Sequence, residues 1–356
     1  MRMHRDKTKK ARSHSGFQQA MDILAREKAN VALMLGNGIN LTSRGSRGIS
    51  WDKLMENLIT LAAANFPVQD ETAVKLRRLL QRGANGETAA SWPEVFDFIL
   101  ATGKIKPELR RRTSNELKLQ SMIAQMLKEM KPGPPHRAVA NWAAQFRVPI
   151  LTTNYDHCFQ DALASDVCKR HRFGNRKPLT DLYPWDRYYA PSIIGDPADS
   201  FAIWHIHGDR ALRRSIRAGL DQYMGMVQRL RKLKLPVAKE ILSGPDEDQR
   251  DDPAFHAAPW LRTFMGKKLW IQGLGLRSAE VSIRWLLIQR LRYWRRFRAE
   301  HRHENGWYVH GPTDKIGQLD EQRRSFFEGL GLKVIEIAKP NEVYLDLFVS
   351  NQKIRS

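Results

Sequence analysis

Three short stretches, far apart in the chain, each end an apolar run with residues that could do chemistry. They are NVALMLGNGIN at 30–40, ILTTNYD at 150–156 and IWHIHGD at 203–209. The carboxamide of Asn154 can donate and accept hydrogen bonds, so it could hold a sugar hydroxyl and a water molecule together. His207 stands before a glycine at an expected strand end, where an imidazole can act as a general base near neutral pH.

Each of these polar breaks also has a purely structural reading. Asn154 and Asp156 follow an apolar run directly and could form an Asx-type turn. A histidine in such a place is often a hydrogen-bonded residue of the core. His205 and His207 alternate along one strand, so they would share a face and could bind a metal together. No Asp, His or Cys cluster completes such a site, and we predict no metal.

Two glycine-rich turns complete the set of candidate residues. GNGIN at 36–40 and GLGLRS at 273–278 each follow a strand-like run. Glycine lets the backbone approach a phosphate, and the N-terminus of a following helix favours negative charge. GNGIN is not a full G-x-G-x-x-G, so a tight turn after a strand accounts for either stretch taken alone.

The elements that must position these residues alternate between strands and helices. Apolar runs before each polar break read as strands, and GWYVHG and LKVIEI near the C-terminus read as two more. Helical spacing appears at 50–66, 136–146 and 319–330, with Ser50 as an N-cap. This alternation predicts an α/β fold, a Rossmann-like parallel sheet with helices on both faces and a helical insertion. Ligands bind such sheets at the C-terminal strand ends, so we expect all the breaks at one edge.

The expected domain organisation is simple. Residues 1–29 form a basic N-terminal arm and helix, and residues 30–356 form the Rossmann-like domain. A helical insertion covers about 67–135 and closes at KPGPP. A basic lid or insertion covers about 210–258.

The charge balance is strongly basic. Lys and Arg number 59 against 38 Asp and Glu, which gives a net charge of +21. Such an excess favours contact with nucleic acid or with an acidic partner protein. Much of it lies at 284–303, where arginines alternate with Trp285, Tyr293, Trp294 and Phe297. We favour core or subunit packing for these aromatic residues. Nucleic-acid contact is the alternative, and it predicts binding that weakens steeply with salt.

Other bulk features bear on where the protein works. No run of about 18 apolar residues is present, so we expect no membrane span. The basic N-terminus is not followed by an apolar segment typical of a secretory signal. The two cysteines, Cys158 and Cys168, do not suggest a disulfide framework. We therefore expect a cytoplasmic protein.

GNGIN, TTNYD, HIHGD and QGLGLRS, in this order, resemble the sirtuin-like family, and more closely the sirtuin-like NAD hydrolases of bacterial anti-phage defence. The resemblance spans residues 30 to about 340. It implies that Asn154 orients the ribose or the attacking water and that His207 is the general base. It also implies a site for NAD as substrate, with Asp156 lining the nicotinamide pocket. The other residues implied to bind NAD are Gly36, Asn37, Gly38 and Asn40 in the first turn, Thr153, and Gly273 and Leu274 on the adenosine side.

The chain also departs from the sirtuins that deacetylate proteins. Those enzymes carry Gly-Ala-Gly and a four-cysteine zinc module, whereas here Asn37 separates the glycines and only two cysteines are present. RGISWDKL stands where they have Pro-Asp-Phe-Arg. These differences argue against deacylation of lysine and leave hydrolysis of NAD.

The function implied by the resemblance is an NAD+ glycohydrolase that depletes NAD in abortive infection. Relatives of this kind act as homo-oligomers, often beside a partner such as a HerA-type ATPase or a short Argonaute. One alternative is a nucleic-acid-binding or nuclease component with a regulatory NAD-binding pocket, although no compact carboxylate cluster for two metals is evident. The other is a sensor that binds NAD without turnover.

Overall fold

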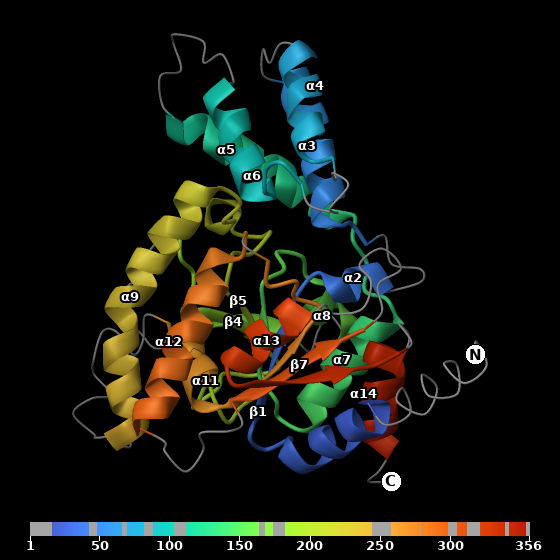
Figure 1. The fold of residues 1–356 in the computed structure, drawn as a ribbon, viewed down its shortest axis with the longest axis vertical. Coiled ribbons are helices and arrows are strands. Elements are labelled where there is room, and N and C mark those ends of the chain that lie inside the picture. Colours follow the sequence, from blue (N-terminus) through green and yellow to red (C-terminus); the bar gives the residue numbers. More distant parts are fainter. Residues whose placement is uncertain are drawn as a thin grey trace.

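An eight-stranded sheet forms the centre of the computed structural model (Figure 1). The strand order is β3-β4-β5-β2-β1-β6-β7-β8. The strands are β1 (Val31–Leu35), β2 (Ile150–Thr152), β3 (Lys169–Arg172), β4 (Arg187–Ala190), β5 (Ile203–His205), β6 (Lys268–Gln272), β7 (Gly306–His310) and β8 (Leu332–Glu336). The structure describes residues 16–42, 48–65, 70–81, 88–102, 112–163, 168–173, 182–243, 258–277, 279–297, 305–311, 321–338 and 342–353.

The sheet is mostly parallel, as predicted. β5, β2, β1, β6, β7 and β8 pair in parallel in that spatial order. The chain runs from β1 to β2 and β5 on one side, and then returns to the other side of β1 for β6, β7 and β8. β3 and β4 extend the sheet as an antiparallel pair that we did not predict. The sequence of β3 is KRHR, whose basic residues hide a strand but suit an exposed sheet edge.

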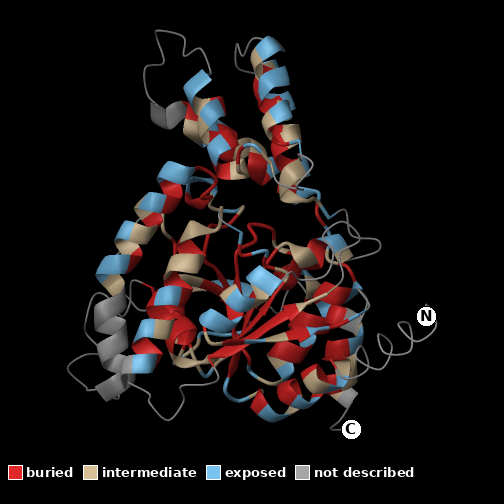
Figure 2. Ribbon diagram, viewed as in Figure 1, coloured by how far each residue is buried: buried red, intermediate tan, exposed pale blue. Residues whose placement is uncertain are grey.

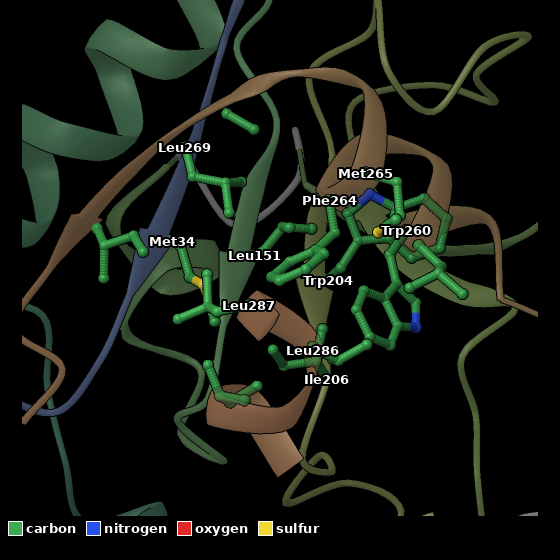
Figure 3. Packing of buried hydrophobic residues seen from close by; sticks show 14 of the residues in the cluster. Met34, Leu151, Trp204, Ile206, Trp260, Phe264, Met265, Leu269, Leu286 and Leu287 are labelled. Carbon is green, nitrogen blue, oxygen red and sulfur yellow. The ribbon is translucent and has the colours of Figure 1, made fainter. Parts of the chain in front are cut away.

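Both faces of the sheet are covered by helices, which confirms that prediction. Successive residues of β1 face opposite hydrophobic clusters, since Leu33 belongs to one and Met34 to the other. The Met34 cluster includes side chains of α11 (Pro259–Gly266) and α12 (Val281–Phe297) (Figure 3). The Leu33 cluster includes α7 (Pro134–Gln145), α14 (Leu347–Lys353) and a helix at 16–27. The inner strands β1, β2, β5, β6 and β7 are almost wholly buried between these layers, whereas β3 and β8 at the two edges carry exposed residues (Figure 2).

A block of four helices stands above one edge of the sheet (Figure 1). It consists of α3 (Trp51–Asn65), α4 (Asp70–Leu79), α5 (Trp92–Thr102) and α6 (Arg112–Lys128). The block has a hydrophobic cluster of its own, to which α3 contributes Leu54 and Leu58. The predicted N-cap is confirmed, because the amide of Lys53 donates to Ser50 Oγ at 3.1 Å.

The basic stretch at 210–258 contains one long helix, α9 (Leu220–Ser243). Its Met226 and Leu230 are buried in the same cluster as Met34. Residues 244–257 and the arm at 1–15 lie outside the described residues. The prediction that aromatic residues of α12 pack in the core is confirmed for Tyr293 and Trp294, which are buried. None of the helices that the structure describes has the length and apolar character needed to cross a bilayer.

Candidate functional site

The polar residues that follow the apolar runs meet at the C-terminal ends of the parallel strands, which form one edge of the sheet. Leu35 at the end of β1 lies beside Thr152 of β2 and Gln272 of β6. Thr152 in turn lies beside His205 of β5. These strands are parallel, so the turns that follow them start at neighbouring positions, as predicted. Thr153, the first residue after β2, ties its strand end to β1 by donating its amide to Leu35 O at 3.2 Å.

The glycines of the two turns pack against each other. The amides of Gly36 and Gly38 donate to Gln272 O and Gly273 O at 3.0 and 2.9 Å. A Cβ on Gly38 would lie 2.6 Å from Gly273 Cα, and one on Gly36 would lie 2.7 Å from the Leu274 side chain. Gly273 itself has φ +69°, which favours glycine. Close backbone packing therefore accounts for these glycines, and the amides of Gly36 and Gly38 already have carbonyl partners.

Asp156 lies in a buried hydrogen-bond network. Asn40 Nδ2 donates to Asp156 Oδ2 at 3.0 Å and to Asn37 Oδ1 at 2.6 Å. The amide of Cys158 donates to Asp156 Oδ1 at 2.9 Å. Burial raises the pKa of Asp156, but nearby His136 and the donors from Cys158 and Asn40 outweigh it, so the pKa is lowered. The carboxylate is therefore ionised at neutral pH.

His136 is a member of this network that the sequence analysis missed. Its Nε2 lies 2.8 Å from Asn40 Oδ1, and its Nδ1 accepts the amide of Gly133 at 3.1 Å. Because Nδ1 accepts, Nε2 carries the proton and donates to Asn40. Burial lowers the pKa of His136 to about 4, so the ring is neutral at pH 7. The Pro-rich run before it indicated only the end of the helical insertion.

Asn154 is buried beside this network, with 2% of its surface exposed. Its amide donates to Thr152 Oγ1 at 3.1 Å, and its carbonyl lies 2.7 Å from His205 Nδ1. In contrast, among the described residues neither Oδ1 nor Nδ2 of its side chain has a hydrogen-bond partner. The main chain of Asn154 is thus fixed while its carboxamide is unsatisfied.

Asn154, whose carboxamide is unsatisfied, lines a small cavity between the sheet edge and the helical block. The cavity measures about 10 Å³, which is about the space of one water molecule. Its lining includes three of the predicted site residues. The full lining is Asn37, Ile49, Trp51, Leu54, Leu127, Asn154, Tyr155 and Asp156.

His207 lies outside the lining of this cavity. It is buried, with Nε2 3.1 Å from Ser282 Oγ and Nδ1 3.4 Å from Tyr223 OH. Burial lowers the pKa of His207 to about 3. The ring is therefore free of its extra proton at neutral pH, but it is a weaker base than predicted. No spacing pattern in the sequence links Tyr223 or Ser282 to this histidine.

The prediction that His205 and His207 share a strand face is wrong. β5 ends at His205, and Gly208 with φ +125° turns the chain away. His205 Nε2 lies 2.6 Å from Nε2 of Gln160 in α8 (Cys158–Ala162), whereas His207 reaches Ser282 of α12. Within the described part of the chain, no group of three or more His, Cys, Asp or Glu side chains could hold a metal ion.

A row of aromatic rings links the cavity to His207. Trp51 stacks on Trp92 with a centroid distance of 5.1 Å and meets Tyr155 edge-on at 5.1 Å. Trp92 contacts Tyr223 at 5.6 Å, and Tyr223 contacts His207 at 5.1 Å. Since Trp51 and Trp92 belong to the helical block, this block shares a packed interface with the candidate site.

A second buried aspartate follows β5. Asp209 Oδ1 lies 2.6 Å from His157 Nε2 and accepts the amide of Ala211 at 2.7 Å. Tyr189 OH donates to Asp209 Oδ2 at 2.6 Å. Burial raises the pKa of Asp209, but the hydrogen bonds of His157 and Tyr189 outweigh it and hold the pKa far below its usual range. This group was not predicted.

Comparison with known proteins identifies no family, since no family model and no curated protein matches the chain. The arrangement of side chains at the sheet edge is therefore the evidence from which a function can be argued.

Proposed function

We propose that the chain is an NAD+ glycohydrolase that cleaves the bond between nicotinamide and ribose. The observation that carries this proposal is the buried Asn154 carboxamide, which is unsatisfied among the described residues and belongs to a residue that lines a cavity together with the ionised Asp156. Leaving a buried polar group without a partner costs about 1–3 kcal/mol. A ligand that supplies a hydroxyl or a water to this side chain would offset that cost.

The order of the strands supports a dinucleotide ligand. Numbered along the chain, the parallel strands β1, β2, β5, β6, β7 and β8 have the spatial order 3-2-1-4-5-6. This order is typical of Rossmann folds, which bind dinucleotides at the strand ends where the order reverses. The two glycine turns meet between β1 and β6, at this reversal.

In the proposed mechanism, the bond from ribose C1′ to nicotinamide breaks and the electron pair leaves with the neutral ring. C1′ then has oxocarbenium character, as in glycoside hydrolysis. The ionised carboxylate of Asp156 stabilises this positive charge in a site from which bulk water is excluded. Asn154 holds the ribose hydroxyl and the water whose oxygen forms the new bond to C1′. The products are nicotinamide, ADP-ribose and a proton.

The resemblance of the motifs, rather than the cavity lining, assigns to His207 the proton released late in this scheme. The His207 pKa of about 3 makes the ring a poor base for removing a proton from water before attack. An oxocarbenium centre is electrophilic enough to be attacked by neutral water, which becomes strongly acidic once bonded. A weak base then suffices, and Ser282 and Tyr223 are the neighbours that hold the ring.

Substrate entry requires a change at the cavity. A pocket for a ligand of this size measures about 300–1,000 Å³, whereas the cavity is about 10 Å³. Trp51 and Leu54 of α3 lie over it and would have to move aside. A closed resting site suits an enzyme that destroys a cofactor needed by the whole cell.

The biological setting is proposed on the resemblance of the four motifs. We expect the enzyme to act in the cytoplasm as a homo-oligomer in abortive infection. A HerA-type ATPase or another defence protein would be its partner. Opening of the cavity would then depend on that partner or on a signal of phage infection.

A second candidate function rests on the basic surface. It is a nucleic-acid-binding or nuclease component in which the NAD pocket is regulatory. Besides the net charge of +21, the exposed side chains of Arg231, Lys232, Arg292 and Arg295 on α9 and α12 favour it. Arg290 does not contribute, because it is buried against carbonyl groups that include Asn305 O at 3.0 Å.

Loss of NAD+ over time, with purified protein, tests the proposal. Wild type and His207→Ala are compared with and without DNA. Loss with wild type alone is expected, together with equal amounts of nicotinamide and ADP-ribose. Retained cleavage by both His207→Ala and Asn154→Ala would sink the assignment. If wild type is inactive under every condition, calorimetry with NAD+ separates an intact pocket from one that binds nothing.

A further inference from the structure

A single directed line of hydrogen bonds runs from the start of α7 to Asp156. The amide of Gly133 donates to His136 Nδ1 at 3.1 Å, which leaves the ring proton on Nε2. Nε2 donates to Asn40 Oδ1 at 2.8 Å. Asn40 Nδ2 then donates to Asp156 Oδ2 at 3.0 Å and to Asn37 Oδ1 at 2.6 Å. His136, Asn40 and Asp156 are all buried.

The orientation of the Asn40 carboxamide is the critical link. Its NH2 group faces two oxygens, those of Asp156 and Asn37, while its oxygen faces His136. A flipped carboxamide would set its oxygen against Asp156 Oδ2, which would then lack the Asn40 donor, while Oδ1 would keep only the Cys158 amide. The proton on His136 Nε2 selects the productive orientation, because it requires an acceptor at Asn40.

We infer that His136 is a positioning residue, which acts through Asn40 to hold the Asp156 carboxylate and the Asn37 side chain at the cavity. Neither His136 nor Asn40 lines the cavity, whereas Asp156 and Asn37 do. The inference rests on the proposed function, since it gives a catalytic purpose to a histidine that would otherwise only begin a helix.

Two substitutions separate these two roles of His136. Glutamine places its Nε2 near the position of the histidine Nε2, so His136→Gln keeps a donor for Asn40 and loses the acceptor for Gly133. Asparagine places its Oδ1 near the position of the histidine Nδ1, so His136→Asn keeps the acceptor for Gly133 and loses the donor. If His136 positions Asp156, His136→Gln should retain catalytic activity and His136→Asn should lose it. If His136 only caps α7, His136→Asn should retain both activity and stability.

The experiment measures kcat and KM for NAD+ hydrolysis by wild type and both variants. We expect His136→Asn to lower kcat by up to about 100-fold with a smaller change in KM, since a small misplacement of a reacting group has this effect. We expect His136→Gln to retain most of kcat even where its thermal unfolding temperature is lower. The reverse order of kcat, or equal loss in both variants, would overturn the inference.

A second readout does not depend on catalysis. The pKa of the Asp156 carboxyl, followed by ¹³C NMR and assigned with Asp156→Asn, is lowered in part by the Asn40 donor. We expect it to rise in both variants, because both lose the imidazole that lowers it, and to rise further in His136→Asn, which also loses the donor to Asn40. An equal pKa in both variants contradicts the positioning role. If wild type neither cleaves nor binds NAD+, the proposed function falls, and this pKa alone decides the inference.

His157→Asn provides the matched control. His157 also bonds to a buried aspartate, but it contacts Asp209, which lies outside the cavity lining. This variant should lose stability while the pKa of Asp156 is unchanged. A change in that pKa as large as in His136→Asn would show that any lost histidine has the effect, and would overturn the inference.

Discussion

Two buried aspartates follow neighbouring strands of this sheet, and their surroundings differ in one respect. Asp156 after β2 is bonded by Asn40 and Cys158, and Asp209 after β5 is bonded by His157, Tyr189 and Ala211. Each carboxylate is thus supplied with donors and has a lowered pKa. Beside Asp156, however, lie a cavity and the unsatisfied Asn154 carboxamide.

This difference supplies a criterion for distinguishing a structural carboxylate from a candidate functional one in this fold. A low pKa and a full set of donors do not distinguish them, because both aspartates have these properties. The informative feature is a neighbouring polar group that the fold positions without satisfying. By this criterion the Asp209 group holds β4, β5 and α8 together, and the Asp156 group is the candidate for ligand binding.

The strongest test of the comparison is Asn154→Ala. We expect turnover of NAD+ to fall by about 100- to 1,000-fold, as when one stabilising donor is removed from an enzyme site. The unfolding free energy should be unchanged or slightly higher, because the lost carboxamide has no partner among the described residues. NAD+ loss and chemical denaturation measure the two effects. A loss of stability that matches the loss of turnover would remove the distinction between the two regions.

Acid should protonate His136 and the Asp209 carboxylate in different pH windows. Burial lowers the pKa of His136 from 6.5 to about 4, and that of His207 to about 3. Between pH 6.5 and 4 the unfolded chain therefore binds more protons than the folded chain, so stability falls as the pH falls. His136 alone accounts for about 3 kcal/mol, at about 1.4 kcal/mol per pKa unit. Denaturation curves at stepped pH measure this loss.

The Asp209 carboxylate should lose its stabilisation only in stronger acid, whereas burial lowers the pKa of neighbouring His205 from 6.5 and adds a loss of stability below that pH. The folded-state pKa of Asp209 lies below the ordinary value of 3.8, so its stabilisation is present above that value and is lost as the pH falls further. In His136→Gln the loss of stability between pH 6.5 and 4 should be smaller than in wild type. An identical pH dependence in both proteins would contradict the assignment of this window to His136.

Asp209→Ala addresses the other side of the comparison. Removing the carboxylate leaves the donors of His157, Tyr189 and Ala211 without their acceptor, and we expect the unfolding free energy to fall by about 3 kcal/mol. At a temperature well below unfolding, NAD+ turnover should change far less than in Asn154→Ala. Urea denaturation and the NAD+ assay, run on one preparation, would show whether stability or turnover responds.

The smallest expected effect concerns the glycine turns. A Cβ on Gly38 would lie 2.6 Å from Gly273 Cα, so Gly38→Ala should cost about 1–3 kcal/mol through forced backbone shifts. Gly195→Ala is the control, because a Cβ there meets nothing within 4 Å. Its effect should stay within about 0.5 kcal/mol. Equal thermal stability of the two variants would argue against close packing as the reason for Gly38.

The meeting of the polar residues at the strand ends could be predicted from the sequence, because the signals that mark a strand end are local. Apolar runs that end in Gly, Asn or His mark strand ends, and parallel pairing brings those ends together without further information. β3 was not predicted, because its sequence KRHR shows no alternation of apolar and polar residues. His205 and His207 were assigned to one face because a strand of unknown length was assumed to continue past His205, where it ends.

The missing site residues were those joined only by tertiary contacts. His136 and Asn40 are 96 positions apart, and His207 and Ser282 are 75 apart. No spacing rule links such pairs, since packing of α7 and α12 on the sheet brings them together. The unsatisfied state of Asn154 is equally invisible in a sequence, because it depends on what every neighbour leaves unbonded.

The central position of β1 in the sheet has a consequence for folding during synthesis. VALML is buried on both faces, yet its partners β2 and β6 begin at Ile150 and Lys268. At about 5–20 residues per second, translation delivers β6 on the order of tens of seconds after β1 leaves the ribosome. The helical block, whose contacts are nearer in sequence, can form during this interval. Until β2 and then β6 emerge, the most apolar strand of the sheet has unpaired backbone groups in the nascent chain. The yield of folded protein then depends on what shields this strand from other chains.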